Sequence, residues 1–263
     1  MKLIVLAKQV PDIEKNVKVN IDSYTQSIKR EGVPSIMNPS DKNALEEALK
    51  IKDINGAEVI VISMGPPQAN EILKEAISMG ADECYLATDR EFAGSDTLST
   101  SLILSEAIRK IGDFDFIFTG KQALDGDTGQ VGPGVAERFN IPQILNSKSI
   151  EVQQCGTCIL TREFMGLEEK INIKTSALVS FNKNINTPRL PTLRGMFKAK
   201  DYKAKILTNS DLKLNTEKIG INGSPTKVVK TFKHEIDKSV TKINIDKGIE
   251  MFDLIISKIE EVK

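Results

Sequence analysis

The sequence predicts an α/β protein built on a doubly wound, mostly parallel sheet, with additional β segments and a C-terminal helical arm. Three observations carry this prediction. Continuous apolar runs of strand length recur along the chain, and strands buried on both faces of a parallel sheet read as such runs. Helical patterns stand between the runs, and glycine ends several of them. Strand and helix alternate through about residue 145, as in a sheet covered by helices on both faces.

The elements follow in order from the first residues. Pro11 ends the polar stretch behind the first strand as a loop. Ser40 or Asp41 can cap the first long helix, and Gly80 and Gly112 stop two later ones. Strands are expected at residues 3–7, 58–63, 84–87 and 114–119. Helices are expected from about residue 40, at 70–79, from 94–96 to 111, and up to about 139.

The pattern changes after Pro142. Alternating β-type segments are expected at residues 149–154, 158–164, 171–175 and 176–181. From about residue 182 the chain is basic and rich in loops, and an amphipathic helix is expected at about 246–262. We therefore expect an α/β domain with added β segments over residues 1–182, a basic strip over 183–205 and a C-terminal extension over 206–263.

Charge is balanced over the whole chain but not along it. The 263 residues include 36 Lys+Arg and 36 Asp+Glu. Because binding to phosphate backbones or anionic lipid needs surplus positive charge, this balance argues against general nucleic-acid and membrane-surface binding. Residues 1–182 carry a net charge of −7 and residues 183–263 carry +7. The basic tail can pack on its own domain or on a partner subunit, and both alternatives stay open.

Side chains suited to metal binding and histidine-based catalysis are scarce. His234 is the single histidine, so a three-histidine zinc site is impossible. Cys155 and Cys158 have the spacing of a redox pair, but they lie between two β-type segments, as a hairpin turn would. The apolar run at residues 3–7 is too short for a secretory signal or a membrane span, and we expect a cytoplasmic protein.

The most informative segment lies at residues 119–137, between a predicted strand and a predicted helix. It contains four closely spaced glycines: Gly126, Gly129, Gly132 and Gly134. At the start of a helix, unpaired backbone N–H groups and the positive end of the dipole favour a phosphate. The glycine spacing matches neither the P-loop nor the dinucleotide-binding fingerprint. The segment is therefore either a nucleotide pyrophosphate site or a glycine-rich turn.

Polar residues near these glycines divide into expected phosphate ligands and expected structural groups. Asp125 and Asp127 would repel a pyrophosphate, so we expect them to hold the loop, cap the helix or reach a ribose hydroxyl. Thr128, Gln130 and the main chain over 129–132 are the expected phosphate contacts. A second polar cluster at residues 94–97 opens another helix on the side where ligands of such sheets bind. Two helix starts facing one crevice favour nucleotide binding.

Six separated motifs stand in a fixed order along the chain. They are Lys8-Gln9-Val10-Pro11-Asp12, Met37-Asn38-Pro39 with Ala44-Leu45-Glu46-Glu47-Ala48, Ser63-Met64-Gly65-Pro66, Ala93-Gly94-Ser95-Asp96-Thr97, the glycine segment, and Pro188-Arg189 through Met196-Lys198-Ala199-Lys200. With them the chain resembles the β subunit of electron transfer flavoproteins over essentially its full length. The resemblance implies a Rossmann-like, adenine-nucleotide-binding domain paired with an α subunit that carries the electron-transferring FAD. It implies an electron carrier rather than a catalyst with its own acid, base or nucleophile.

The resemblance implies one of two ligands. In the simple class the β subunit holds AMP as a structural ligand. In the electron-bifurcating class it holds a second FAD, which exchanges a hydride with NAD(H) and passes electrons to ferredoxin or flavodoxin and, through the α-subunit FAD, to a partner dehydrogenase. Gly126 and Thr128 favour the bifurcating class, since the simple class tends to have another acid and a cysteine there. AMP in place of FAD stays the alternative.

The resemblance also implies partner contacts. The stretch 187–200 corresponds to a loop that docks a flavin-dependent dehydrogenase, of the acyl-CoA or the 2-hydroxy acid type. Leu193 is its expected apolar anchor, beside Arg194 and Met196. The helix at about 246–262 corresponds to an arm that embraces the α subunit. Outside the family, a nucleotide-binding regulator or an ATP-pyrophosphatase-like enzyme is the remote alternative.

The loops and the resemblance together define the expected cofactor-binding residues. These are Ala7, Lys8, Asn38, Met64, Gly65, Gly94, Ser95, Asp96, Thr97, Thr119, Gly120, Lys121, Gln122, Asp125, Gly126, Asp127, Thr128, Gly129, Gln130, Val131, Gly132 and Pro133. No side chain is expected to be catalytic or to bind a metal.

Overall fold

The computed structural model describes residues 1–12, 34–153, 157–174, 176–226, 228–229, 252 and 255–257. The chain divides into two compact units, Met1–Val229 and Lys230–Lys263. In the second unit, residues 252 and 255–257 are helical, and the rest of the helix expected at 246–262 lies outside the described residues. The first unit extends to Val229, past residue 206, the expected start of the C-terminal extension.

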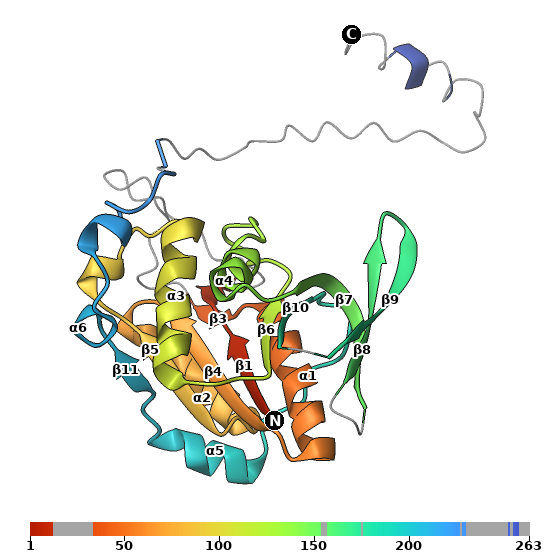
Figure 1. Cartoon of the computed structure of the whole chain (residues 1–263), viewed down its shortest axis with the longest axis horizontal. Helices are drawn as coiled ribbons and strands as arrows, with labels where there is room; N and C mark the ends of the chain where they lie inside the picture. Colours follow the sequence, from red (N-terminus) through yellow and green to blue (C-terminus); the bar gives the residue numbers. More distant parts are fainter. Residues whose placement is uncertain are drawn as a thin grey trace. The chain divides into compact units, whose positions relative to one another are not determined.

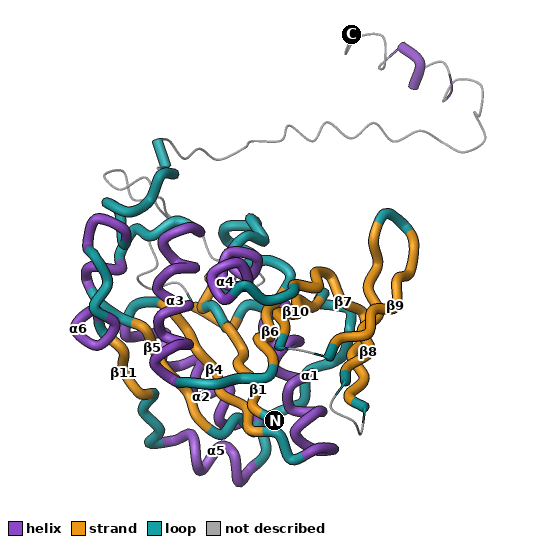
Figure 2. The backbone as a smooth tube through the Cα atoms, in the orientation of Figure 1, coloured by secondary structure: helices purple, strands orange, loops and turns teal. Residues whose placement is uncertain are grey.

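A nine-stranded sheet forms the centre of the first unit (Figures 1 and 2). Its strands lie in the order β11-β5-β4-β1-β6-β10-β7-β8-β9. Neighbours from β11 to β7 are parallel, and the pairs β7-β8 and β8-β9 are antiparallel. The bounds are β1 Lys2–Leu6, β4 Glu58–Met64, β5 Glu83–Ala87, β6 Phe116–Gly120, β7 Gln143–Val152, β8 Cys158–Phe164, β9 Leu167–Ile173, β10 Ala177–Phe181 and β11 Lys205–Leu207. The doubly wound, mostly parallel sheet predicted from the sequence is confirmed.

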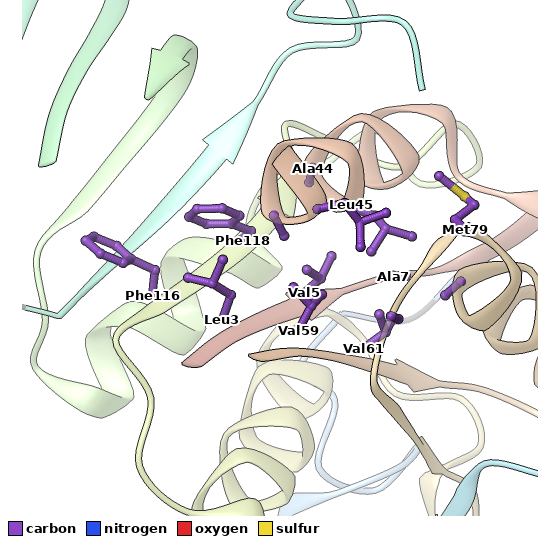
Figure 3. Packing of buried hydrophobic residues seen from close by; sticks show 14 of the residues in the cluster. Leu3, Val5, Ala7, Ala44, Leu45, Val59, Val61, Met79, Phe116 and Phe118 are labelled. Carbon is purple, nitrogen blue, oxygen red and sulfur yellow. The ribbon is translucent and has the colours of Figure 1, made fainter. Parts of the chain in front are cut away.

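Helices cover both faces of this sheet. The helices α1 (Pro39–Asn55) and α2 (Asn70–Met79) pack on one face, and α3 (Thr97–Ile111) and α4 (Val131–Phe139) on the other. Val5 points toward Leu45 of α1, and Leu3 lies beside Phe118 of β6, as Figure 3 shows. Ile4, between Leu3 and Val5, belongs to the core on the opposite face. Because alternate side chains of a strand point to opposite faces, the apolar run of β1 fills both cores.

Three strands, β7, β9 and β10, differ in extent or place from their expectations. β9 begins at Leu167, ahead of the expected residue 171. β7 begins at Gln143, ahead of the expected residue 149, because its first residues pair with β10 and bury Ile144. The register shifts near Asn146, whose φ is +61°, and β7 then pairs with β8. β10 lies inside the parallel sheet, between β6 and β7, although a hairpin of β8 and β9 precedes it in the chain. The hairpin of β8 and β9 extends the sheet beyond β7, so that β9 is the edge strand on that side.

Shorter elements complete the first unit. β2 (Gln9–Pro11) and β3 (Ser35–Met37) pair as a separate antiparallel ribbon. Residues Leu193–Lys200 form the helix α5, where the resemblance implied a loop. Thr192 caps α5 by accepting the Gly195 N–H, and α5 packs against α2 with Ala199 buried. The sequence pattern missed α5 because its apolar residues are mostly exposed and do not mark a core face. The short helix α6 (Asn209–Leu212) follows β11.

Candidate nucleotide-binding site

The carboxyl ends of the parallel strands meet along one edge of the sheet, where the expected ligand loops begin. In three of these loops, a backbone N–H just after the strand still hydrogen bonds to the neighbouring strand. The N–H of Ala7 donates to the carbonyl of Ile62 at 2.9 Å, that of Gly65 to the carbonyl of Ala87 at 3.1 Å, and that of Lys121 to the carbonyl of Phe181 at 2.8 Å. Met64, at the end of β4, packs half-buried against the core under α3. The loops after β1, β4 and β6 are therefore fixed beside one another, at the edge where α/β sheets bind ligands.

The start of α1 connects two of these loops through Asn38. Its backbone N–H donates to the carbonyl of Lys8 at 2.8 Å. Its side-chain amide donates to the carbonyl of Gln122 at 2.9 Å and accepts the N–H of Leu124 at 3.1 Å. Because Asn38 is buried, these hydrogen bonds are shielded from water and tie the loop after β1 to the loop after β6.

Asp41 makes the same connection by a second route. The sequence treated it as a possible helix cap, but α1 begins at Pro39 and Asp41 lies inside the first turn. Its two carboxylate oxygens accept the backbone N–H of Lys8 at 2.8 Å and of Gly120 at 3.0 Å. Burial raises the pKa of Asp41 to about 6, against the lowering effect of these donors. Asp41 is a site residue that sequence reasoning missed, and its helix-start position was the signal available.

The loop after β6 is held by its own side chains. Lys8 donates to the carboxylate of Asp125 at 2.6 Å, and the amide of Gln122 donates to the carboxylate of Asp127. Asp127 and Gly129 both have positive φ, 50° and 61°, so the chain turns sharply at each of them. Both carboxylates are thereby engaged by other groups of the loop rather than left free beside a phosphate.

The start of α4 offers hydrogen-bond donors. Gln130 precedes the helix and makes no side-chain cap. The N–H groups of the first turn, at Val131 and Gly132, have no partner within a helix. Thr119 lies beneath them: its buried hydroxyl has no hydrogen-bond partner among the described residues, and a Cβ added at Gly132 would stand 3.2 Å from it. Polar groups suited to an anion are therefore gathered where β6 meets α4.

The start of α3 lies next to the start of α4. Thr97 donates its hydroxyl to the side-chain oxygen of Gln130 at 3.2 Å, which links the two helix starts. Asp96 caps α3 by accepting the Ser99 N–H at 3.0 Å. Its other carboxylate oxygen accepts the backbone N–H of Thr226, also at 3.0 Å. Thr97 is thus hydrogen bonded to the glycine loop, whereas the carboxylate of Asp96 accepts backbone N–H groups of Ser99 and Thr226.

Ser95 and Gly94 also contact the later chain. The Ser95 hydroxyl donates to the carbonyl of Phe92 at 2.8 Å and accepts the N–H of Gly220 at 3.1 Å. Gly94 has a φ of +76°, and its carbonyl accepts the hydroxyl of Ser224 at 3.3 Å. No local pattern in the sequence signals these partners, which lie more than a hundred residues away. The contact of residues 220–226 with the start of α3 was not predicted from the sequence.

Several known proteins are similar to this chain. Residues 25–212 match the family described as the electron transfer flavoprotein domain. The chain is 49% identical over 232 residues to the electron transfer flavoprotein subunit beta of Thermoanaerobacterium thermosaccharolyticum, covering 88% of this chain and 87% of that protein. It is 44% identical over 262 residues to the subunit of the same name from Clostridium acetobutylicum, covering 99% and 98%. It is 43% identical over 233 residues to the caffeyl-CoA reductase-Etf complex subunit CarD of Acetobacterium woodii, covering 88% and 87%.

The chain belongs to the electron transfer flavoprotein family. The matched relatives named as subunit beta confirm the resemblance seen in the six sequence motifs. Family membership implies a flavin or nucleotide ligand and an α-subunit partner. Within the first unit, polar groups suited to an anion lie at the junction of β6 with α4.

The expected docking residues of this electron transfer flavoprotein subunit lie on α5, away from the glycine loop in the sequence and in the fold (Figure 1). Leu193 is 77% exposed, and Met196 and Phe197 are also exposed, so α5 presents an apolar surface to solvent. Gly195 sits against α2: a Cβ there would come within 2.1 Å of the carbonyl oxygen of Ser78. This close approach fixes where α5 stands.

An ion-pair cluster holds the segment before α5 onto α1. Arg189 donates from its backbone N–H and from its guanidinium to Glu46, each at 2.9 Å, and from the guanidinium to Asp53 at 2.8 Å. Glu46 is buried. The preceding Asn186 hydrogen bonds to Asn43, one turn earlier on α1. The residues leading into the expected docking surface are therefore anchored to the same helix that fixes the ligand loops.

The described residues offer little for metal or thiol chemistry. They contain no group of three or more His, Cys, Asp or Glu that could hold a metal ion. Cys84 and Cys158 are buried, and burial raises the pKa of both thiols, that of Cys158 to about 11. Cys155 and His234 lie outside the described residues. In the part of the chain that the structure describes, no helix has both the length and the apolar character to cross a bilayer.

Proposed function

We propose that this chain is the β subunit of a heterodimeric, electron-bifurcating electron transfer flavoprotein. In this proposal the glycine loop and the start of α4 hold an FAD, which when bound exchanges a hydride with NAD(H) and passes electrons to ferredoxin or flavodoxin and, through the α-subunit FAD, to a partner dehydrogenase. The chain itself binds and orients the cofactor and supplies no acid, base or nucleophile.

The observation that carries the proposal is the set of polar groups at the junction of β6 with α4. A pyrophosphate needs several donors and few free carboxylates. The first turn of α4 is not capped by Gln130, the hydroxyl of Thr119 is buried without a partner among the described residues, and Thr128 is exposed in the same loop. Asp125 is paired with Lys8. The residues present fit a pyrophosphate group.

Gly126 supports FAD over AMP. A Cβ added at this position would have only the Lys8 ammonium, at 4.0 Å, within reach. The main chain is therefore open to close approach by a ligand, and no side chain fills the space. FAD has a pyrophosphate that can use this opening, whereas AMP has a single phosphate. A subunit that holds structural AMP is the alternative outcome of the tests below.

The same proposal assigns roles to the individual loop residues. Main-chain N–H groups over 129–132, with Thr128 and the amide nitrogen of Gln130, would bind the phosphates. Gln130 is suited to this because its side-chain oxygen already accepts from Thr97, which leaves its NH₂ group to donate. Ala7, Gly65 and Lys121 would line the edge of the sheet beside the ligand.

We infer that the exposed apolar face of α5 docks the partner dehydrogenase, with Leu193 as the anchor. An exposed leucine next to Met196 and Phe197 and surrounded by basic residues has the composition of a binding hot spot with a polar rim. One relative, 43% identical, is named as a subunit of a caffeyl-CoA reductase-Etf complex, which supports a CoA-linked flavoenzyme as partner. We propose that the arm, the helix expected at about residues 246–262, contacts the α subunit.

Coupled electron transfer tests this function. The purified αβ complex is mixed with NADH, ferredoxin and an acyl-CoA dehydrogenase, with and without its enoyl-CoA. The proposal expects ferredoxin to be reduced only when the enoyl-CoA is present, since the two electrons of one hydride must go to different acceptors. A parallel reaction replaces the acyl-CoA pair by a 2-hydroxy acid dehydrogenase and its oxo acid. Absence of NADH-dependent ferredoxin reduction in both reactions would contradict bifurcation and favour the AMP-holding class.

A further inference from the structure

Asp41 is a buried acid to which electron transfer itself assigns no role. It lies in the first turn of α1, and its two oxygens accept N–H groups from two different strand ends, Lys8 after β1 and Gly120 at the end of β6. These are two of the strands from which the expected ligand loops leave. A carboxylate that accepts both N–H groups connects the loop after β1 to the loop after β6.

The contact between Asp41 and the end of β6 requires glycine at residue 120. A Cβ added at Gly120 would come into contact with the Asp41 carboxylate, and it would lie 2.6 Å from Ser40, so only glycine permits this approach. Asn38, one turn earlier, independently bonds the carbonyl of Gln122 and the N–H of Leu124. Two polar residues at the start of α1 therefore determine where the loop after β6 stands relative to the loop after β1.

Charged groups near Asp41 come from each element packed against it. Lys8, in the loop after β1, favours the ionised form of Asp41 by its charge, while its ammonium is paired with Asp125 in the loop after β6. On α1 itself the neighbouring Lys42 is paired with Glu75 of α2. Burial outweighs these influences and raises the pKa of Asp41 to about 6. Ionisation can therefore change between about pH 5 and pH 7.

We propose that Asp41 is a positioning residue that makes retention of the nucleotide depend on pH, because its carboxylate holds the two ligand loops in register and its protonation releases one of them. This inference rests on the proposed function. A carboxylate accepts both N–H groups as charge-assisted hydrogen bonds, whereas a protonated carboxyl keeps one good acceptor and turns an O–H toward the other donor. Each N–H donor lowers the pKa of Asp41, so releasing one loop while Asp41 stays buried raises that pKa further, and protonation favours the released loop. The nucleotide is therefore held more tightly above about pH 6 than below it.

The direct test measures nucleotide release from the purified αβ complex between about pH 5 and pH 8. Filtrates are analysed for FAD and AMP by mass, so that either ligand of the β site is detected. If binding is linked to one proton, the dissociation constant rises by up to about tenfold per pH unit below the midpoint. For Asp41→Asn we expect weaker retention, by about tenfold, at every pH and no remaining pH dependence, since the amide presents one acceptor and one donor group.

Asp82→Asn is the matched control. Asp82 also accepts a backbone N–H, that of Val59 at 2.9 Å, but at the opposite, amino-terminal edge of the strands. This variant should keep the wild-type pH profile of release. A flat profile in the wild type, or an unchanged profile in Asp41→Asn, would overturn the proposal. A complex with neither FAD nor AMP at pH 8 would contradict the proposed function instead.

Hydrogen exchange tests the connection through Asp41 even if the variant does not fold or no nucleotide is bound. In the wild-type complex, amide protection of the peptides containing Lys8 and Gly120 should fall between about pH 7.5 and pH 5, after correction for the intrinsic rate. The peptide containing Val59 should keep its protection over the same range. Equal changes in the three peptides would mean that Asp41 does not control the loops.

Discussion

Gly126 is the position at which a single side chain should decide the ligand of the β site. Its α-carbon faces open space, and only the Lys8 ammonium lies near the place that a Cβ would take. We expect Gly126→Asp to leave the fold intact but to empty the β site of FAD, because a new carboxylate would repel a pyrophosphate. Flavin content of the αβ complex after gel filtration measures this.

Gly126→Ala is the control for that substitution. It adds the Cβ without the charge, so FAD occupancy should fall much less than in Gly126→Asp. Full occupancy in the aspartate variant would remove residue 126 from the ligand site.

The two buried cysteines should be chemically inert in the folded chain. Burial raises the pKa of Cys158 to about 11 and also raises that of Cys84, so the thiolate that reacts with alkylating agents is scarce at pH 8. After treatment of the native complex with iodoacetamide at pH 8, mass spectrometry should find both residues unmodified. Unfolding in urea should make both react. Rapid labelling of Cys158 in the native state would mean that the start of β8 opens readily.

Sequence reasoning reached some of these residues and not others. The glycine loop and Lys8 stand out locally, because unusual residue types cluster directly after apolar runs. Asp41 does not, since an acid in the first turn of a helix is ordinary and its partners lie on other strands. Ser95 and Asp96 were expected at the ligand but bond to residues 220–226, and no pattern in one sequence reveals such a distant partner.

Among the elements, α5 carries the docking surface of the proposal. Leu193 is 77% exposed and makes little contribution to the core. We expect Leu193→Ala to keep flavin content and melting temperature unchanged while electron transfer to the dehydrogenase falls by about tenfold or more, as for a hot-spot anchor. Ile54→Ala, an equally exposed apolar residue at the end of α1, is the control and should transfer electrons normally. Unchanged rates for Leu193→Ala would remove α5 from the docking site.

The clamp between Arg189 and α1 should act on docking rather than on cofactor binding. Glu46 is buried and accepts from both the main chain and the guanidinium of Arg189. Glu46→Gln removes the charge from a paired, buried group, which loosens the segment leading to α5. We expect the KM for the dehydrogenase to rise several-fold with little change in kcat and in flavin content. Loss of flavin together with docking would show that the clamp supports the whole domain.

Element by element, the parallel core was predictable and its flanks were less so. Strands such as β1 and β4 are recognisable by continuous apolar runs, because both faces are buried. β10 reads the same way, yet its place between β6 and β7 depends on pairing that no local pattern records. α5 was expected as a loop since its amphipathic face is turned outward and its position depends on the contact of Gly195 with Ser78.

For the molecule as a whole, the 36 basic and 36 acidic residues cancel because an acidic part and a basic part are joined in one chain. The proposal gives these two parts different roles. The acidic part, residues 1–182, contains the ligand loops and every strand of the main sheet except β11. The basic remainder contains α5, the edge strand β11 and the second unit, Lys230–Lys263. Such a separation suits a subunit that holds a cofactor with one part and meets acidic partner surfaces with the other.

The most direct test of the central claim counts the ligands of the assembled protein. The chain is co-expressed with its α subunit, the heterodimer is purified and denatured, and FAD and AMP are quantified per heterodimer. We predict two FAD and no AMP, one FAD in the β site of this chain and one in the α subunit. One flavin together with one AMP would contradict the account and would make this chain the AMP-holding subunit of a simple electron transfer flavoprotein.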